Sequence, residues 1–600
     1  MNAKSDESRR PEGSSRGTSR AGARRPLTSR QAQYLVAPTS PSINELALAE
    51  RLERLSERCG AIEVVRTVAS RVGAGPPVAV VRMKPEQVGM FRESAGDALW
   101  IERDTPLQLA STPAAQFAAG PARPFYTSGK GFTAHIQIFD ENDQPLEGAE
   151  VQIAGQDWMA QGFAASDGKA ELPLYGESPQ TAAELLIRPR AGAWGLWKNN
   201  PDLQADGIAT VNLRPLPKQA NRAWAAAVMG FDRLPSDCDG GGVKIALIDT
   251  GVATTHKQLG DVTYGTDAVR GEERSWSQDP VGHGTSCAGI LVAAPAEDGL
   301  PGYAPAAELH VFKLPLDACC SDLLAVLEDC IQARVDLVCL GYGSERGSTI
   351  VEQRIAAAKE RGVAIIASAG NNGSRVQFPA CSTHVLSVGA IGRSGSFPDD
   401  SPHAAHELTA ERFGGGIFMP AFSSYGPELD LCAPGVSVVC CQSPDGYAAW
   451  DGTSLAAAHV TALAALVLAH HADFQNLFAV RDATRVERLF QLLKQTAQPL
   501  ADSVRTGAGV PYAPRALGLQ LQPHGASLNA ALGDMREALQ RAGLWGQRET
   551  LQPPRGPAMT THLALDVNPP IIMRASGGRG AGRLHDLKAA MQRVGLSPEG

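Results

Sequence analysis

The sequence lacks several features that would place its function elsewhere. Its 600 residues carry a formal net charge of -8, so it has no large cationic surface field with which to bind nucleic acid. Its longest apolar run, residues 455–469, is interrupted by His459 and Thr461 and is shorter than the roughly 20 residues that a membrane crossing needs. We therefore predict neither a nucleic-acid partner nor a membrane span, and we interpret residues 455–469 as a buried helix.

The cysteines and the first thirty residues exclude further classes. The eleven cysteines include several in apolar segments, such as Cys339 in LVCL, and their odd number favours buried thiols over a disulfide framework. No Cys-x-x-Cys pair is present, which argues against a structural zinc site. Residues 1–30 carry eight Lys or Arg against three acids and no continuous apolar segment, which predicts a disordered basic tail and not a secretory signal. We expect a cytoplasmic protein, with secretion by an unrecognised route as the alternative.

The remaining chain is long enough for several domains. Residues 31–110 show the order β-α-β-β-α-β, which is typical of a ferredoxin-like α+β domain. One helix in this region is expected to begin with a capping box of Ser42 and Glu45, with an apolar face of Leu48, Leu52 and Leu55. Residues 111–130 are rich in Ala, Pro, Gly and Ser and are predicted to be a linker.

Three further regions follow the linker. Residues 131–216 contain short alternating strands between turn signals, which predicts a small β-sandwich. Residues 217–520 alternate strands and helices, which predicts an α/β domain with a parallel sheet and helices on both faces. Residues 521–600 are predicted to be a C-terminal extension with short helices at 533–544 and 585–596.

Three polar residues of the α/β domain are candidates for catalysis. Asp249 follows the buried-strand signal of residues 243–248, and ligands in open α/β sheets bind beyond the carboxyl ends of the strands. His283 lies between glycines before an apolar helix, and Ser454 stands at the start of the long apolar helix. Each alone has an ordinary explanation as a turn residue, a helix-entry residue or an N-cap. Together they supply the nucleophile, the base and the orienting anion that acyl transfer requires.

The sequence around these residues resembles the subtilisin-like (S8) serine protease family. The resemblance covers residues 230–520, and the family also has the chain order Asp, His, Ser. It implies a serine endopeptidase that acts on proteins or peptides, with Asp249, His283 and Ser454 as its catalytic triad. The blocks that carry it are IALIDTGV, GHGTSCAGI, GYAPAAELHVFKL, VDLVCLGYG, GVAIIASAGNNG, FSSYGPELDLCAPG and DGTSLAAAHVTALAAL.

The same resemblance implies further site residues. Asn371 matches the oxyanion-hole asparagine of the family, with the backbone N–H of Ser454 as the second donor. Gln377 is expected to reach the floor of the pocket for the side chain before the scissile bond (P1), where a polar or mid-sized group would be tolerated. The substrate-binding residues implied by the resemblance are Leu340, Gly341, Tyr342, Ala367, Ser368, Ala369 and Gly370.

The sequence also departs from the family pattern. Leu455 and Ala458 stand where Met and Pro are usual, and both changes keep apolar volume. We interpret His256 and His459 as structural residues. Structural calcium is common in the family, but no acidic loop here has a recognisable ligand spacing, so no metal or cofactor is predicted.

The regions before residue 217 carry weaker resemblances. Residues 31–110, with the ending ALWIERD, are similar to the propeptide of many subtilases, which implies a zymogen whose prodomain inhibits it. Self-cleavage is expected between about residues 105 and 130, with a site near 216 as the alternative. The sandwich is similar to prealbumin-like or carboxypeptidase-regulatory modules, and its partner stays open. Two other functions remain: a transpeptidase or cyclase that excludes water from the acyl-enzyme, and a non-catalytic peptide-binding pseudoprotease.

Overall fold

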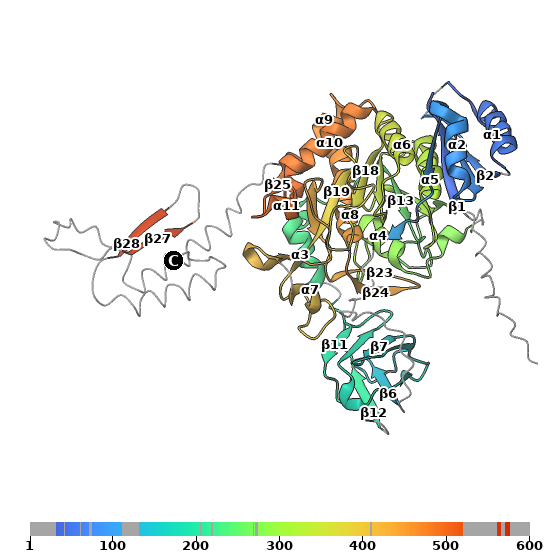
Figure 1. The fold of residues 1–600 in the computed structure, drawn as a ribbon. Coiled ribbons are helices and arrows are strands. Elements are labelled where there is room, and N and C mark those ends of the chain that lie inside the picture. The colour runs from blue at the N-terminus through green and yellow to red at the C-terminus, as the bar shows by residue number, and fades with distance from the viewer. Residues whose placement is uncertain are drawn as a thin grey trace, which may run out of the picture. The chain divides into compact units, whose positions relative to one another are not determined.

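The structure is a computed structural model of the chain (Figure 1). Residues 1–518 and 519–600 form two separate units. The expected tail at 1–30, the linker at 111–130 and the two C-terminal helices lie outside the described residues. The structure describes residues 32–110, 131–519, 561–565 and 571–575, except for gaps at 41, 61, 71–74, 205–206, 218–219, 268, 270–273 and 409–410.

The N-terminal domain has the predicted element order. Its antiparallel sheet has the strand order β2-β3-β1-β4, which is the ferredoxin-like arrangement. The predicted capping box is wrong: α1 begins after Asn44, whose Oδ1 accepts the N–H of Ala47 at 2.9 Å. Asn is an N-cap as good as Ser, and the Ser42 hydroxyl instead contacts the Ser40 hydroxyl at 2.8 Å. The elements are β1 (Ala32–Pro38), α1 (Glu45–Cys59), β2 (Glu63–Val68), β3 (Val78–Met83), α2 (Gln87–Ala95) and β4 (Leu99–Arg103).

The second region is the predicted β-sandwich. One sheet has the order β11-β10-β7-β8 and the other the order β12-β6-β9. Along β6, Ala134, Ile136 and Ile138 are buried and alternate with more exposed residues, so the apolar side chains fill the space between the sheets. The strands are β6 (Phe132–Phe139), β7 (Glu150–Ala154), β8 (Met159–Phe163), β9 (Lys169–Leu174), β10 (Glu184–Arg188), β11 (Leu196–Asn199) and β12 (Ile208–Asn212).

The third region is the predicted α/β domain, built on a nine-stranded sheet. The order is β14-β15-β13-β16-β18-β19-β21-β20, with β22 also pairing with β19. All pairs are parallel except those of β21 with β19 and β20 at one edge. The strands are β13 (Lys244–Asp249), β14 (Tyr264–Asp267), β15 (Glu308–Lys313), β16 (Leu337–Leu340), β18 (Ala364–Ser368), β19 (Leu386–Arg393), β20 (Glu411–Arg412), β21 (Ile417–Met419) and β22 (Leu431–Pro434).

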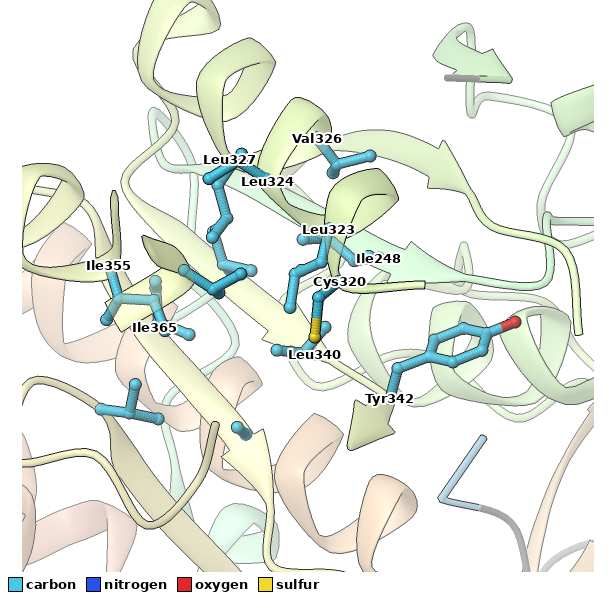
Figure 2. Close-up of a cluster of buried hydrophobic side chains, with 14 of the residues drawn as sticks. Ile248, Cys320, Leu323, Leu324, Val326, Leu327, Leu340, Tyr342, Ile355 and Ile365 are labelled. Atoms are coloured by element: carbon cyan, nitrogen blue, oxygen red, sulfur yellow. The ribbon is translucent and has the colours of Figure 1, made fainter. Parts of the chain in front are cut away.

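Helices cover both faces of this sheet (Figure 1). Helices α5 (Cys320–Ala333) and α6 (Thr349–Glu360) pack together on one face, where Leu323 and Leu327 meet Ile248, Leu340 and Ile365 of the strands (Figure 2). On the other face lie α4 (His283–Val292) and α8 (Thr453–His470), which also contact each other. Alternate strand residues thus enter two different cores.

Helix α8 matches the predicted buried helix. It is the one helix among the described residues that is long and apolar enough to cross a membrane, but 89% of its apolar window is buried inside the protein. Its side chains from Thr453 to Leu468 are all buried, because strands β16, β18, β19 and β22 contact one side and α4 another. The helix therefore anchors its N-terminal residues firmly in the core.

The C-terminal unit contains an element that was not predicted. The described part of residues 519–600 includes an antiparallel hairpin of β27 (Thr561–Leu565) and β28 (Ile571–Ala575), which the sequence did not indicate.

Candidate active site

Three elements of the α/β domain end or begin at the candidate triad. Asp249 is the last residue of β13, whose preceding four residues are all buried. His283 is the first residue of α4, and Ser454 is the second residue of α8. Because α4 and α8 pack on the same face of the sheet, their N-termini meet at the carboxyl end of β13.

The three side chains form a continuous hydrogen-bonded path. The Nδ1 atom of His283 lies 2.7 Å from Oδ1 of Asp249, and its Nε2 atom lies 2.7 Å from Oγ of Ser454. All three residues are at most 1% exposed. This geometry lets the imidazole take a proton from the hydroxyl while the carboxylate fixes its orientation.

The buried acid Asp279, which the sequence analysis did not identify, stabilises the segments that carry Asp249 and His283. Asp279 accepts hydrogen bonds from the Thr250 hydroxyl at 2.8 Å, the Gly282 N–H at 2.9 Å and the Thr285 N–H at 2.8 Å. It thereby holds the first turn of α4, which carries His283, and the residue after Asp249. The sequence signal that could have identified Asp279 is its position four residues before His283, next to the N-terminus of a helix.

Two glycines allow the close packing of these groups. Gly282 has φ +85°, a left-handed conformation that L side chains rarely adopt, and it lets the chain turn into α4. At Gly341 a Cβ atom would overlap the Asp249 carboxylate and lie 3.4 Å from Cε1 of His283. Any side chain at Gly341 would therefore displace the triad.

The charges around His283 favour its protonated form. Burial lowers the pKa of the imidazole, but the Asp249 carboxylate, through charge and a hydrogen bond, and the charge of Asp279 together raise it by more, so the pKa lies above its ordinary 6.5. The ring also meets Trp450 edge to face, with centroids 6.1 Å apart. The site can thus stabilise an imidazolium during the reaction.

One cluster at the site has the composition of a metal site but not its chemistry. Potential ligand atoms of Asp249, His283 and Cys287 lie within 4.8 Å of one another. Burial raises the pKa of the Cys287 thiol well above 9.0, which disfavours the thiolate that metals bind. Both other residues already bind each other. These residues do not fit a metal.

Asn371 follows β18 and points one donor toward the serine. Its Oδ1 accepts the Thr453 N–H at 3.0 Å and the Thr453 hydroxyl at 2.8 Å, which fixes the amide. Its Nδ2 is buried and has no hydrogen-bond partner among the described residues. Both Nδ2 and the Ser454 Oγ border Gly452. A buried donor without a partner beside a nucleophile is suited to bind a developing oxyanion.

An extended segment of the chain itself occupies the cleft, which the sequence did not indicate. Strand β5 (Gln108–Leu109) pairs antiparallel with β17 (Tyr342–Gly343). The Ala110 N–H donates to the Gly341 carbonyl at 2.7 Å, and the Ser454 hydroxyl donates to the Ala110 carbonyl at 2.9 Å. A peptide bond of the chain therefore lies against Ser454 in the manner of an added strand.

The residues expected to form the substrate walls fall into two groups. The side chains of Leu340, Tyr342, Ala367 and Ala369 enter the hydrophobic core, as Figure 2 shows for the first two, so only their backbone is available to a substrate. The Tyr342 hydroxyl donates to the Leu314 carbonyl at 3.0 Å, away from Ser454.

The other wall residues lie closer to the cleft. Gly341 binds Ala110, as described above, and the Gly370 N–H donates to the Thr453 hydroxyl at 3.2 Å. The Ser368 hydroxyl donates to the Leu340 carbonyl at 3.3 Å. A Cβ at Gly370 would overlap the Gln377 side chain, so Gln377 narrows this space.

The two histidines that were interpreted as structural, His256 and His459, make hydrogen bonds outside the triad. The Nδ1 atom of His459 lies 2.8 Å from the Leu455 carbonyl in its own helix, and Nε2 of His256 lies 3.0 Å from the Gly446 carbonyl. Neither hydrogen bond involves the triad. All eleven cysteines are free, and eight of them are buried, as predicted.

A nucleophile, a base and an acid at the carboxyl edge of a parallel sheet define a serine hydrolase type of site. A profile of the subtilase family matches residues 240–518. Subtilisin DY of Bacillus licheniformis is 32% identical over 279 residues, which cover 45% of this chain and 89% of that protein.

Two further relatives show the same degree of similarity. Subtilisin E of Bacillus subtilis is 32% identical over 45% of this chain and 64% of its own length. M-protease of Shouchella clausii is 31% identical over 51% of this chain and 71% of its own. The chain belongs to the subtilase family and is a serine endopeptidase.

Proposed function

We propose that the protein hydrolyses peptide bonds through a catalytic triad of Asp249, His283 and Ser454 and an acyl-enzyme, and that it is made as a zymogen. The observation that carries the catalytic part is the pair of 2.7 Å contacts that join the three side chains. A non-catalytic relative would have no need to keep this path together with the Nδ2 of Asn371, which has no hydrogen-bond partner among the described residues.

The mechanism follows from the positions of the groups. Ser454 Oγ attacks the carbonyl carbon of the substrate while Nε2 of His283 accepts its proton, and Asp249 holds the tautomer and stabilises the cation. Nδ2 of Asn371 and the Ser454 N–H donate to the oxyanion. His283 then protonates the leaving amine, the C–N bond breaks, and water releases the acyl group by the reverse transfers.

The catalytic part is tested by single replacements in the triad. Ser454→Ala, His283→Ala and Asp249→Asn are each expected to lower the hydrolysis of casein and of a peptide library by several orders of magnitude. Ser396→Ala, which removes a hydroxyl that donates to the Arg393 carbonyl 2.8 Å away, serves as the control and should keep full activity. Normal hydrolysis by Ser454→Ala would refute the mechanism.

The same assay separates hydrolysis from transfer to an amine. With a peptide library, mass spectrometry should detect products with free carboxylates, as expected when water attacks the acyl-enzyme. Joined or cyclic peptides as the main products would instead assign a transpeptidase, which uses the same residues.

The zymogen part of the proposal rests on the segment in the cleft. Because the Ala110 carbonyl lies 2.9 Å from the Ser454 hydroxyl, we expect cleavage of the bond between Ala110 and Ser111. The sequence alone predicted self-cleavage between about residues 105 and 130, and the position of Ala110 reduces this range to one bond. Residues 32–110 would then stay in place as an inhibitor, because Glu102 and Asp104 accept backbone N–H groups at the starts of α6 and α5.

Sequencing of the N-terminus after expression tests this step. The wild-type protein should yield a chain that begins at Ser111, and Ser454→Ala should stay whole because it cannot cut itself. Ala110→Asp, which puts a charge at a residue that is buried in the cleft, should delay the cut. An active wild-type protein that keeps residues 32–110 joined to the rest would contradict the zymogen proposal.

A further inference from the structure

A cavity of about 590 Å³ lies between the β-sandwich and the α/β domain. One wall is the sandwich sheet β11-β10-β7-β8, with Glu150, Phe163 and Arg188, and the loop residue Arg190. The opposite wall comes from the α/β domain, with Val281 and with Trp450 at the end of β24 (Gly446–Trp450). None of the three triad residues lines this cavity, so it is separate from the catalytic groups themselves.

The cavity adjoins the side of the triad from which the leaving group departs. Its wall includes Val281, two residues before His283, and Asp451, three residues before Ser454. Trp450 contacts the His283 ring, and that ring delivers the proton to the leaving amine. The part of the peptide before the scissile bond occupies the other side, against β17.

The two walls are held in a fixed relation by backbone hydrogen bonds. The Gly192 N–H donates to the Tyr447 carbonyl at 2.8 Å, and the Trp197 N–H donates to the Asp400 carbonyl at 2.6 Å. An edge-to-face contact of Trp194 with His403 lies between these bonds along the sandwich, with centroids 5.6 Å apart. The cavity is therefore a built space, and an incoming peptide does not have to bring its walls together.

The acids in the lining of the cavity are already compensated. Glu150 accepts hydrogen bonds from Arg188 at 3.0 Å, Gln152 at 2.7 Å and Gln161 at 2.5 Å. Asp451 accepts from His403 at 2.8 Å and is paired with His406 at 3.2 Å. Both carboxylates therefore have partners within the protein, and their side chains are only 23% and 9% exposed.

The cations are compensated less completely. Among the described residues Arg190 forms no ion pair, and it is exposed at the cavity. Arg188 binds Glu150 through Nη1, whereas its Nη2 has no hydrogen-bond partner in the described part of the chain. The exposed charge in the lining is therefore the guanidinium of Arg190, in a cavity that also has the apolar surfaces of Phe163 and Trp450.

We propose that this cavity binds the substrate residues that follow the scissile bond, and that Arg190 selects an acidic side chain among the second to the fourth of them. The inference rests on the proposed proteolytic function and adds its substrate class. An extended peptide advances about 3.3 Å per residue, so a chain leaving His283 past Trp450 reaches the cavity within a few residues. A guanidinium binds a carboxylate in two parallel hydrogen bonds, which suits this selection.

Three substrates test the proposal on the mature enzyme. Two internally quenched peptides share the sequence up to a P1 alanine and differ afterwards, with Ala-Glu-Glu-Ala in one and Ala-Lys-Lys-Ala in the other. The third, a peptidyl anilide, has no residues after the scissile bond. We expect kcat/KM of the wild-type enzyme to favour the acidic peptide about fivefold or more, as for a partly shielded ion pair.

Two matched variants locate the preference. Arg190→Glu should reverse it, whereas Lys169→Glu, the same charge change on a strand outside the cavity lining, should keep it. The anilide should be cleaved equally by all three proteins, which also verifies that the variants are folded.

Each outcome decides the question. Equal cleavage of both peptides by the wild-type enzyme overturns the inference while the proposed protease function stands, even if Arg190→Glu fails to fold. An acidic preference that survives in an Arg190→Glu enzyme with normal anilide activity also overturns it. A wild-type enzyme that cleaves none of the three substrates refutes the proposed function, and the inference falls with it.

Discussion

Among single residues, Asn371 combines a fixed oxygen with a buried nitrogen that has no hydrogen-bond partner in the part of the chain that the structure describes. Thr453 holds Oδ1, so Nδ2 is preorganised and needs no rearrangement when charge develops on the substrate. We predict that Asn371→Leu lowers kcat by roughly two to three orders of magnitude, a figure that comes from subtilisin itself, with little change in KM. Steady-state kinetics with an anilide check this. A large rise in KM at unchanged kcat would assign Asn371 to substrate binding instead.

The raised pKa of His283 predicts the direction of the acid limb in the pH profile. The imidazole must be neutral to accept the Ser454 proton, so activity is lost as the pH falls through its pKa. Since Asp249 raises that pKa above 6.5, kcat/KM should reach half its maximum above pH 6.5. In Asp249→Asn the Asp249 charge is gone and burial outweighs the remaining charge of Asp279, so the residual activity should show a lower midpoint. An unchanged midpoint would contradict this account of the charges.

The candidate residues were predictable to different degrees. Asp249, His283, Ser454 and Asn371 stand in sequence blocks whose letters are tied to their chemistry, and the structure brings them together. The directions of the wall side chains depend on strand pleating and on the core beneath them. For this reason the sequence did not indicate that Tyr342 turns into the core (Figure 2).

At the scale of elements, two acids of the N-terminal domain stabilise two helices of the α/β domain. Glu102 accepts the Thr349 N–H at 3.0 Å at the start of α6, and Asp104 accepts the Ser321 N–H at 3.0 Å at the start of α5. These contacts complement the positive ends of the helices. The two domains also share an apolar core, because Leu35 and Val80 of the N-terminal domain belong to the same cluster as Leu323 of α5.

Loss of these caps should weaken the uncleaved protein. In a Ser454→Ala background, Glu102→Gln and Asp104→Asn are each expected to reduce the free energy of unfolding by about 1 kcal/mol, the usual contribution of a helix cap. Denaturant titration measures this. Glu93→Gln, at an exposed position of α2, is the control and should change little. Equal stability of all variants would show that the caps contribute nothing to the contact between the domains.

Element order was more predictable than pairing. Periodicity gave the ferredoxin-like order, the sandwich strands and the parallel sheet, because each pattern reports local burial. It did not give the two-residue pairing of β5 with β17, because such a short strand has no period and is held by a distant edge. The same holds for the start of α1, where two nearby residues were both suitable caps.

At the scale of the whole molecule, the catalytic domain of a subtilase is combined with two additional domains. The alternating strands and turn signals of residues 131–216 indicated a sandwich but not the surface on which it packs. That position depends on a few contacts, such as those of Gly192 and Trp197, between segments far apart in the sequence. The resulting cavity beside Trp450 could therefore be found only in the folded protein.

The central claim, that Ser454 is the nucleophile, is tested most directly by finding where a fluorophosphonate probe attaches to the mature enzyme. After digestion, tandem mass spectrometry should place the label on Ser454 alone, and prior incubation with a peptide substrate should slow the labelling. A label on any other residue, or undiminished labelling of Ser454→Ala, would contradict the account.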